Sequence, residues 1–259
     1  MDILRLEAVT KRFGGIVACK DISFGIPEGR IMGLIGPNGA GKTTIFNLIT
    51  GVYSLTAGRI YFRGADITRL RPDELVALGI ARTFQNIRLF RNLTVLDNVR
   101  IAVDRNLPYS FGAALARLPS VLSKERAVYR QATEYLAALG LSGRAGDRAD
   151  SLPYGLQRKL EIARALALKP KLLLLDEPAA GMNPEESAEL ARLIRRIHGE
   201  FGLTTLLIEH HMDVVMELCE QIYVLNFGVK LAEGDAETVQ GNPDVLRAYL
   251  GEGYKRAGN

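Results

Sequence analysis

The chain has 259 residues, enough for one sizeable hydrophobic core or for a core with a subdomain. Its 47% hydrophobic and 24% charged residues are ordinary for a globular protein, and no apolar run approaches the roughly 20 residues that a transmembrane helix needs. The net charge of +4 comes from scattered basic residues, so we expect a solvated surface and no nucleic-acid partner. Cys19 and Cys219 are too few for a disulfide framework and are expected to be buried, in a reducing compartment.

The first 65 residues read as strands and turns. Residues 22–26 alternate apolar and polar side chains, which predicts a half-buried strand, and residues 27–29 predict a turn. The apolar run 30–35 predicts a strand buried on both faces, followed by a glycine-rich loop and a helix that begins near Lys42. Residues 59–63 predict a further strand.

Between residues 87 and 151 the strand signals fade, and we predict a helical insertion. Residues 125–139 carry apolar side chains at helical spacing and end at Gly140. Residues 106–123 contain two prolines and a glycine, which favours a short helix between loops.

From Gln157 onward strands and helices alternate again. A helix should end at Ala167, a buried strand should cover 171–175, and Asn183 should cap a new helix. Strands at 204–208 and 222–225 follow, with a hairpin turn at 227–228. Repeated strand–helix–strand units predict a parallel sheet with helices on its faces.

Residues 36–43 match the pattern G-x-x-x-x-G-K-[ST], with a predicted strand before them and a helix after them. In this pattern the backbone amides enclose a phosphate, the lysine reaches the β- and γ-phosphates, and the hydroxyl binds Mg²⁺. The residues that we expect to bind a nucleoside triphosphate here are Gly36, Pro37, Asn38, Gly39, Ala40, Gly41, Lys42, Thr43 and Thr44.

Asp176 and Glu177 end an apolar strand, at the sheet edge where parallel sheets carry their sites. Asp176 suits Mg²⁺, and Glu177 suits a general base for the attacking water. His210 follows another strand, where a neutral imidazole could bond the γ-phosphate or that water. A solvated turn at 176–177 and a histidine without a catalytic role remain the alternatives at this point.

These residues, in this order, resemble the ATP-binding cassette (ABC) ATPases over essentially the whole chain. The resemblance implies an α/β P-loop NTPase fold with a RecA-like core and an N-terminal antiparallel β subdomain over 1–86 and 156–259. A helical subdomain is expected at 87–155. By the same resemblance, Phe13 stacks on adenine, Gln85 binds Mg²⁺ with Thr43 and Asp176, and Glu177 and His210 are catalytic. The alternatives are a core aromatic for Phe13 and a polar loop residue for Gln85.

The signature segment of this family falls at Leu152, Pro153, Tyr154 and Gly155, and its first half departs from the usual Leu-Ser-Gly-Gly-Gln. Pro153 replaces a serine and removes one N–H and one hydroxyl. In the family, two ATPase subunits close head to tail, and each site combines one phosphate loop with the other subunit's signature. We therefore expect the site that Pro153 completes to be the weaker one.

Runs at 81–90, 160–164, 177–181 and 242–251 look like the LivG-type ATPases of bacterial branched-chain amino acid importers. The expected function is ATP hydrolysis that drives such import. The ATPases of lipopolysaccharide export and of urea or aromatic-acid import, and a soluble ABC ATPase, are the alternatives, because nothing in this sequence touches the solute.

The resemblance also implies partners and a location. The direct partners are permease subunits and a second ATPase subunit, which forms a heterodimer with this chain in vivo, with a homodimer of the chain alone as the alternative. A periplasmic or surface solute-binding protein is an indirect partner. Residues 1–3 begin with strand-like sequence in place of a signal peptide, so we expect the cytoplasmic face of the bacterial inner membrane.

Overall fold

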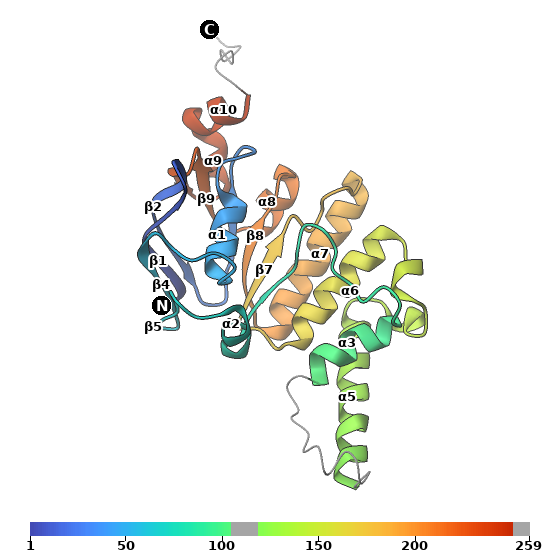
Figure 1. The fold of residues 1–259 in the computed structure, drawn as a ribbon. Helices are drawn as coiled ribbons and strands as arrows, with labels where there is room; N and C mark the ends of the chain where they lie inside the picture. The colour runs from blue at the N-terminus through green and yellow to red at the C-terminus, as the bar shows by residue number, and fades with distance from the viewer. Residues whose placement is uncertain (105–118, 251–259) are drawn as a thin grey trace. The chain divides into compact units, whose positions relative to one another are not determined.

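The structure is a computed structural model that describes residues 1–104 and 119–250. The chain forms two compact units: a core unit, Met1–Arg82 with Lys171–Asn259, and a helical unit, Thr83–Pro170. The predicted division of the chain, with a helical insertion at 87–155, has different boundaries from these units and stays a prediction. The elements drawn in Figure 1 are β1 (Asp2–Phe13), β2 (Ile16–Pro27), β3 (Ile31–Ile35), α1 (Lys42–Ile49), β4 (Ala57–Phe62), β5 (Ala65–Asp66), α2 (Pro72–Leu78), β6 (Ile80–Arg82), α3 (Val95–Asp104), α5 (Pro119–Ala138), η1 (Ser142–Arg144), η2 (Ala149–Ser151), α6 (Tyr154–Ala167), β7 (Leu172–Asp176), α7 (Pro184–Phe201), β8 (Thr204–Ile208), α8 (Met212–Leu218), β9 (Gln221–Asn226), β10 (Val229–Gly234), α9 (Ala236–Gly241) and α10 (Pro243–Leu250).

The core unit is built around a six-stranded sheet in the order β10-β9-β3-β8-β7-β6. β3 pairs in parallel with β8 and β9, and β7 pairs in parallel with β6 and β8. β10 runs antiparallel to β9. Every residue of β3, β7 and β8 is buried, which explains their unbroken apolar sequences, because each strand is covered on both faces.

A second sheet of the core unit is antiparallel, in the order β2-β1-β4-β5. Ile22, Phe24 and Ile26 of β2 are buried, as the alternating sequence predicts, while Asp21 and Ser23 are exposed. Ile22, Phe24 and Ile26 belong to one hydrophobic cluster with buried residues of β3 and α1. The two sheets therefore enclose a common core around α1.

One hairpin turn and one helix start in the core unit follow directly from local sequence. Phe227 and Gly228 connect β9 to β10 with φ of 45° and 75°, the left-handed pair that a tight hairpin needs. Asn183 caps α7: its side chain accepts from the Glu186 amide at 2.9 Å, and the Glu186 carboxylate accepts from the Asn183 amide at 3.0 Å. The predicted hairpin and helix start are both confirmed.

In the helical unit α3, α5 and α6 pack on one another through buried side chains such as Val99, Leu136 and Leu160. The helix predicted at 125–139 corresponds to α5, which ends one residue earlier, at Ala138. The short helix predicted at 106–123 falls largely outside the described residues, and from Pro119 onward its range belongs to α5. Over residues 1–104 and 119–250 no helix has both the length and the apolar character needed to cross a bilayer.

Candidate functional site

The glycine-rich loop lies between the end of β3 and the start of α1, where the sequence places it. Gly36, Gly39 and Gly41 have φ of 150°, 80° and 101°, a region that side chains with a Cβ rarely occupy. A Cβ on Gly36 would stand 2.1 Å from the Leu225 carbonyl oxygen, and one on Gly41 would stand 2.7 Å from that of Ala18. Conformation therefore favours glycine at all three positions, and lack of space also requires it at Gly36 and Gly41.

Lys42 folds back onto this loop. Its ammonium donates to the carbonyl oxygens of Gly36 at 2.6 Å and Pro37 at 3.0 Å, and the side chain is buried. Burial lowers the pKa of Lys42, and the charges of Glu177 and Asp176 oppose that change. A cation thus lies beside both carboxylates at the place where phosphate oxygens would bind.

Asp176 ends β7 and is held by Arg82, at the end of the neighbouring strand β6. Arg82 Nη2 lies 2.6 Å from Asp176 Oδ2, with only 7% and 3% of the two side chains exposed. Arg82 Nη1 also donates to Asn47 Oδ1 at 2.7 Å. Arg82 and Asn47 were not among the predicted site residues, because only the tertiary structure places β6 beside β7 and brings Asn47 of α1 to Arg82.

Glu177 and His210 meet across the ends of β7 and β8, with His210 Nε2 2.8 Å from Glu177 Oε1. Glu177 has φ of 47°, and its amide donates to the Ile208 carbonyl at 2.9 Å, which turns the chain off the strand at this residue. A carboxylate and an imidazole are thus in direct contact beside the glycine-rich loop. A carboxylate at this place can act as a general base on a water within hydrogen-bond reach.

Glu209 was not predicted, yet it organises this pair. Its side chain is 1% exposed. Oε1 accepts from the Ala179 amide at 2.7 Å, and Oε2 accepts from the amides of His210 at 2.7 Å and His211 at 3.1 Å. One buried carboxylate therefore fixes both the segment after Glu177 and the segment that bears His210.

A hollow of about 500 Å³ lies over the loop. Its lining residues are Ile16, Val17, Ala18, Asn38, Gly39, Ala40, Gly41, Lys42, Thr43, Thr44, Glu177, His210 and Phe227. The structure thus brings the predicted loop and the predicted catalytic pair together. Ile16, Val17 and Phe227 were missed, because their exposure of 73%, 39% and 86% beside the loop is a property of the tertiary structure that no sequence pattern shows.

Phe13 lies at the end of β1, outside that lining. Its ring stands edge-on to Tyr53, with centroids 5.1 Å apart, and the Lys11 ammonium lies 4.9 Å from its centroid. The ring is 42% exposed, so it is not a core aromatic. Its role in stacking on a base stays a prediction.

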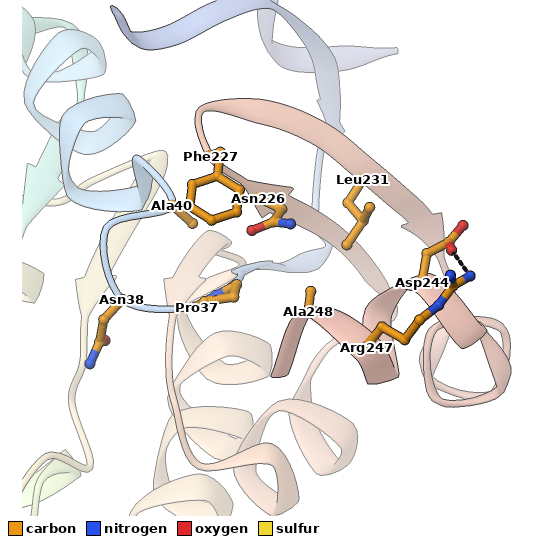
Figure 2. Close-up of a pocket in the computed structure, with 9 residues that line it drawn as sticks. All are labelled: Pro37, Asn38, Ala40, Asn226, Phe227, Leu231, Asp244, Arg247 and Ala248. Atoms are coloured by element: carbon orange, nitrogen blue, oxygen red, sulfur yellow. Dashed lines mark hydrogen bonds and ion pairs between the residues drawn. The ribbon is translucent and has the colours of Figure 1, made fainter. Parts of the chain in front are cut away.

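The other side of the loop is backed by the β9–β10 turn and α10. Gly228 donates its amide to the Ala40 carbonyl at 3.0 Å. A hollow of about 700 Å³ lies between these segments. Figure 2 shows Pro37, Asn38 and Ala40 on one side of it and Arg247 and Ala248 on the other. Farther along α10, burial raises the pKa of Tyr249 to about 12, and the Gly36 backbone opposes that change. The C-terminal helix therefore lies directly behind the loop.

The remaining predicted residues belong to the helical unit. Gln85 is exposed in the segment before α3. Pro153 is the N-cap of α6, Leu152 is buried before it, and Tyr154 and Gly155 form the first turn of the helix. Pro153 and Tyr154 are exposed.

Comparison with known proteins identifies the family. The ABC transporter family model matches residues 19–180, and a model described as branched-chain amino acid ATP-binding cassette transporter matches residues 229–255. The high-affinity branched-chain amino acid transport ATP-binding protein BraF of Pseudomonas aeruginosa is 43% identical, over 96% of this chain and 98% of its own length. LivG of Escherichia coli K12 is 42% identical over the same shares.

Comparison with solved structures also points to the ABC ATPase fold. The ADP conformation of MJ1267, an ATP-binding cassette of an ABC transporter, superimposes with a TM-score of 0.84 at 34% identity, covering 97% of this chain and all of that one. The dimeric post-hydrolysis cassette MJ0796 bound to ADP and Pi gives 0.76 at 26% identity, covering 90% and 98%. The predicted fold class is confirmed, and the chain belongs to the ABC transporter ATP-binding proteins, of the LivG/BraF type.

Proposed function

We propose that this chain hydrolyses ATP to drive a bacterial importer of branched-chain amino acids, with Glu177 as general base and His210 as its partner. The observation that carries the catalytic part is the 2.8 Å contact between these two side chains, at a hollow that also contains Lys42. Hydrolysis of ATP belongs to the family; the residue roles and the solute are our proposal.

The loop amides and Lys42 would bind the β- and γ-phosphates, which requires the ammonium to exchange its bonds to Gly36 and Pro37 for phosphate oxygens. Glu177 would accept a proton from water as the water oxygen attacks the γ-phosphorus and the bond to ADP breaks. His210 would keep both the Glu177 carboxylate and the water in line.

Mg²⁺ fits the side chains that the sequence assigns to it. Thr43, Gln85 and Asp176 offer a hydroxyl, an amide oxygen and a carboxylate, the oxygen ligands that this cation takes. The Arg82 contact fixes one oxygen of the Asp176 carboxylate and so orients the group. When bound, Mg²⁺ would neutralise charge that develops on the phosphates.

For the assembly, we propose a head-to-tail pair of ATPase subunits bound to permease subunits at the cytoplasmic face of the membrane. Each site would combine Gly36–Thr43 of one subunit with Leu152–Gly155 of the other. The relatives' association with branched-chain amino acid transport and the matched segment 229–255 support the choice of solute over lipopolysaccharide, urea or aromatic acids.

The catalytic test is Glu177→Gln in the chain assembled with its native permease. We expect ATP binding to be kept and phosphate release to fall by at least about 100-fold, because an amide cannot accept the proton. Glu185→Gln, an exposed acid at the start of α7, is the matched control and should hydrolyse like the parent. Lys42→Ala should lose ATP binding as well, and normal hydrolysis by either Glu177→Gln or Lys42→Ala would overturn the proposal.

The solute is tested separately with vesicles that contain the assembled transporter. Binding proteins loaded with leucine, with urea or with an aromatic acid are added in turn, and phosphate release is measured. Stimulation by the leucine-loaded protein alone is expected. Stimulation by one of the others in its place would reject the branched-chain assignment while leaving the ATPase assignment intact.

A further inference from the structure

The first two turns of α6 hold the segment that bears Gln85, through a side chain with no exposed surface. Arg158 Nη1 donates to the Phe84 carbonyl oxygen at 2.7 Å and lies 2.7 Å from Glu161 Oε2. Its Nη2 donates to the Gln85 carbonyl oxygen at 2.8 Å and to the Tyr154 hydroxyl at 3.1 Å. A single guanidinium thus joins the Gln85 segment to the start of the signature helix.

Glu161, one turn further along α6, accepts hydrogen bonds from backbone amides of the same segment. Its Oε1 accepts from the Phe84 amide at 3.2 Å and from the Arg88 amide at 3.3 Å. Burial raises the pKa of Glu161, and the charge of Arg158 opposes that change. Arg158 and Glu161, which we call the α6 clamp, therefore bind two carbonyls and two amides of residues 84–88.

Arg164 adds an attachment two turns from Arg158. It donates to the Arg88 carbonyl oxygen, and its guanidinium lies 4.8 Å from the centre of the Phe90 ring. The segment from Phe84 to Phe90 is thereby held along the length of the helix, and the α6 clamp forms the end nearest to Tyr154.

Stability alone does not call for a charged pair at this place. Removing two charges from water is costly, and a well-packed apolar pair of similar volume often supports a fold as well or better. What an apolar pair cannot do is bind carbonyls and amides of an irregular segment in one defined geometry. The α6 clamp is therefore better explained by a role in positioning residues 84–88 than by a contribution to the stability of the fold.

We infer that Arg158 and Glu161 are positioning residues that make the Gln85 segment and the signature segment at Tyr154 and Gly155 move as one body. A displacement of the Gln85 segment by the permease would then reach the signature that faces the other subunit's nucleotide. This inference rests on the proposed function, because that function gives the two segments their roles.

Hydrogen exchange on the full chain tests the clamp directly. In Glu161→Ala the amides of Phe84 and Arg88 lose their acceptor, so their exchange should become about tenfold faster, as expected for the loss of one hydrogen bond. Arg144→Ala, which removes an exposed ion pair with Asp147 in the same unit, is the matched control and should leave both rates unchanged. Unchanged exchange in Glu161→Ala would overturn the inference.

Coupling is tested in the assembled transporter. Glu161→Ala and Arg158→Lys should lower permease-stimulated kcat by about tenfold with KM for ATP unchanged, since the phosphate loop is untouched. Glu161→Gln, which keeps an oxygen acceptor for the two amides, should recover part of the loss. Full stimulation in Glu161→Ala would overturn the inference.

A double variant separates positioning from folding. Arg158→Met with Glu161→Leu replaces the pair by apolar side chains. The ion pair itself is dispensable for stability, but four backbone groups lose their partners, so the Tm should fall, and stimulation measured well below that Tm should be lost. A folded double variant that keeps its stimulation would contradict the inference. Absence of stimulation in the parent assembly would instead count against the proposed function, so the two failures are distinguishable.

Discussion

Several residues at the site act through backbone geometry more than through chemistry of their own. Glu209 is the clearest case, because its buried carboxylate accepts from the amides of Ala179, His210 and His211. Hydrogen bonds of amides to a charged acceptor in a buried place are strong, and an unpaired buried amide is costly. The position of His210 against Glu177 thus depends on a neighbour that contacts no phosphate in the proposed reaction.

Glu209→Gln tests this dependence. The new side-chain amide would place N–H groups against the backbone N–H groups that it must bind, so we expect unfolding free energy to fall by about 1–3 kcal/mol. Phosphate release should fall by about tenfold with KM for ATP unchanged, which steady-state kinetics would measure. Glu217→Gln, an exposed acid in α8, is the control. Unaltered kcat in Glu209→Gln would show that His210 needs no such support.

At the scale of elements, α7 shows how local sequence defines a boundary. Pro184 takes the first helical position, Asn183 and Glu186 satisfy each other's amides, and Gly202 ends the helix at φ of 59°. The apolar face of α7 is buried, and Arg192 and Arg195 are exposed, which agrees with the solvated surface expected for the basic residues. His198 on the same helix is partly buried, and its ring lies 3.2 Å from the Gly29 carbonyl oxygen.

Asn183→Ala should remove the α7 cap. We expect a loss of about 1 kcal/mol in unfolding free energy, because the Glu186 amide loses its acceptor. Urea unfolding followed by circular dichroism measures this change. Arg192→Ala, exposed in the middle of α7, should stay within about 0.5 kcal/mol of the parent. Equal stability of Asn183→Ala and the parent would contradict the capping assignment.

At the scale of the whole molecule, the functional residues are divided between the two units. The phosphate loop, Asp176, Glu177 and His210 belong to the core unit, whereas Gln85 and the signature residues belong to the helical unit. In the proposed assembly each nucleotide is bound by the core unit of one subunit and the helical unit of another. One subunit therefore affects two sites, and a change in its signature appears at the site built on its partner's loop.

Pro153→Ser is the corresponding prediction. Pro153 is the N-cap of α6 with no side-chain capping bond, and serine would supply both a capping hydroxyl and an N–H. We expect transport by the assembled complex to stay the same or to rise. The measurement is leucine uptake into vesicles that hold ATP on the side of the membrane where the ATPase subunits lie. A large loss of ATPase activity in that complex would refute the idea that the Pro153 site is the weaker one.

Much of the site follows from consecutive residues, and those parts were predictable. The loop 36–43, the strand that ends in Asp176 and the capped start of α7 each carry their information in a short stretch of sequence. Arg82, Asn47, Glu209 and Arg158 were missed for a common reason: each works through partners that pattern and spacing cannot pair with it. Arg82 meets Asp176 across 94 positions of the chain.

The sequence by itself determined the family, the phosphate loop and the elements that flank it, because glycine conformation, helix capping and strand burial are local properties. Only the tertiary structure decided which charges lie together. Strand order sets Arg82 on Asp176, strand ends bring His210 to Glu177, and the packing of α6 binds residues 84–88 through Arg158 and Glu161. The physical reason is that such contacts depend on the path of the whole chain, and the low dielectric of a buried position makes them strong only once that path is complete.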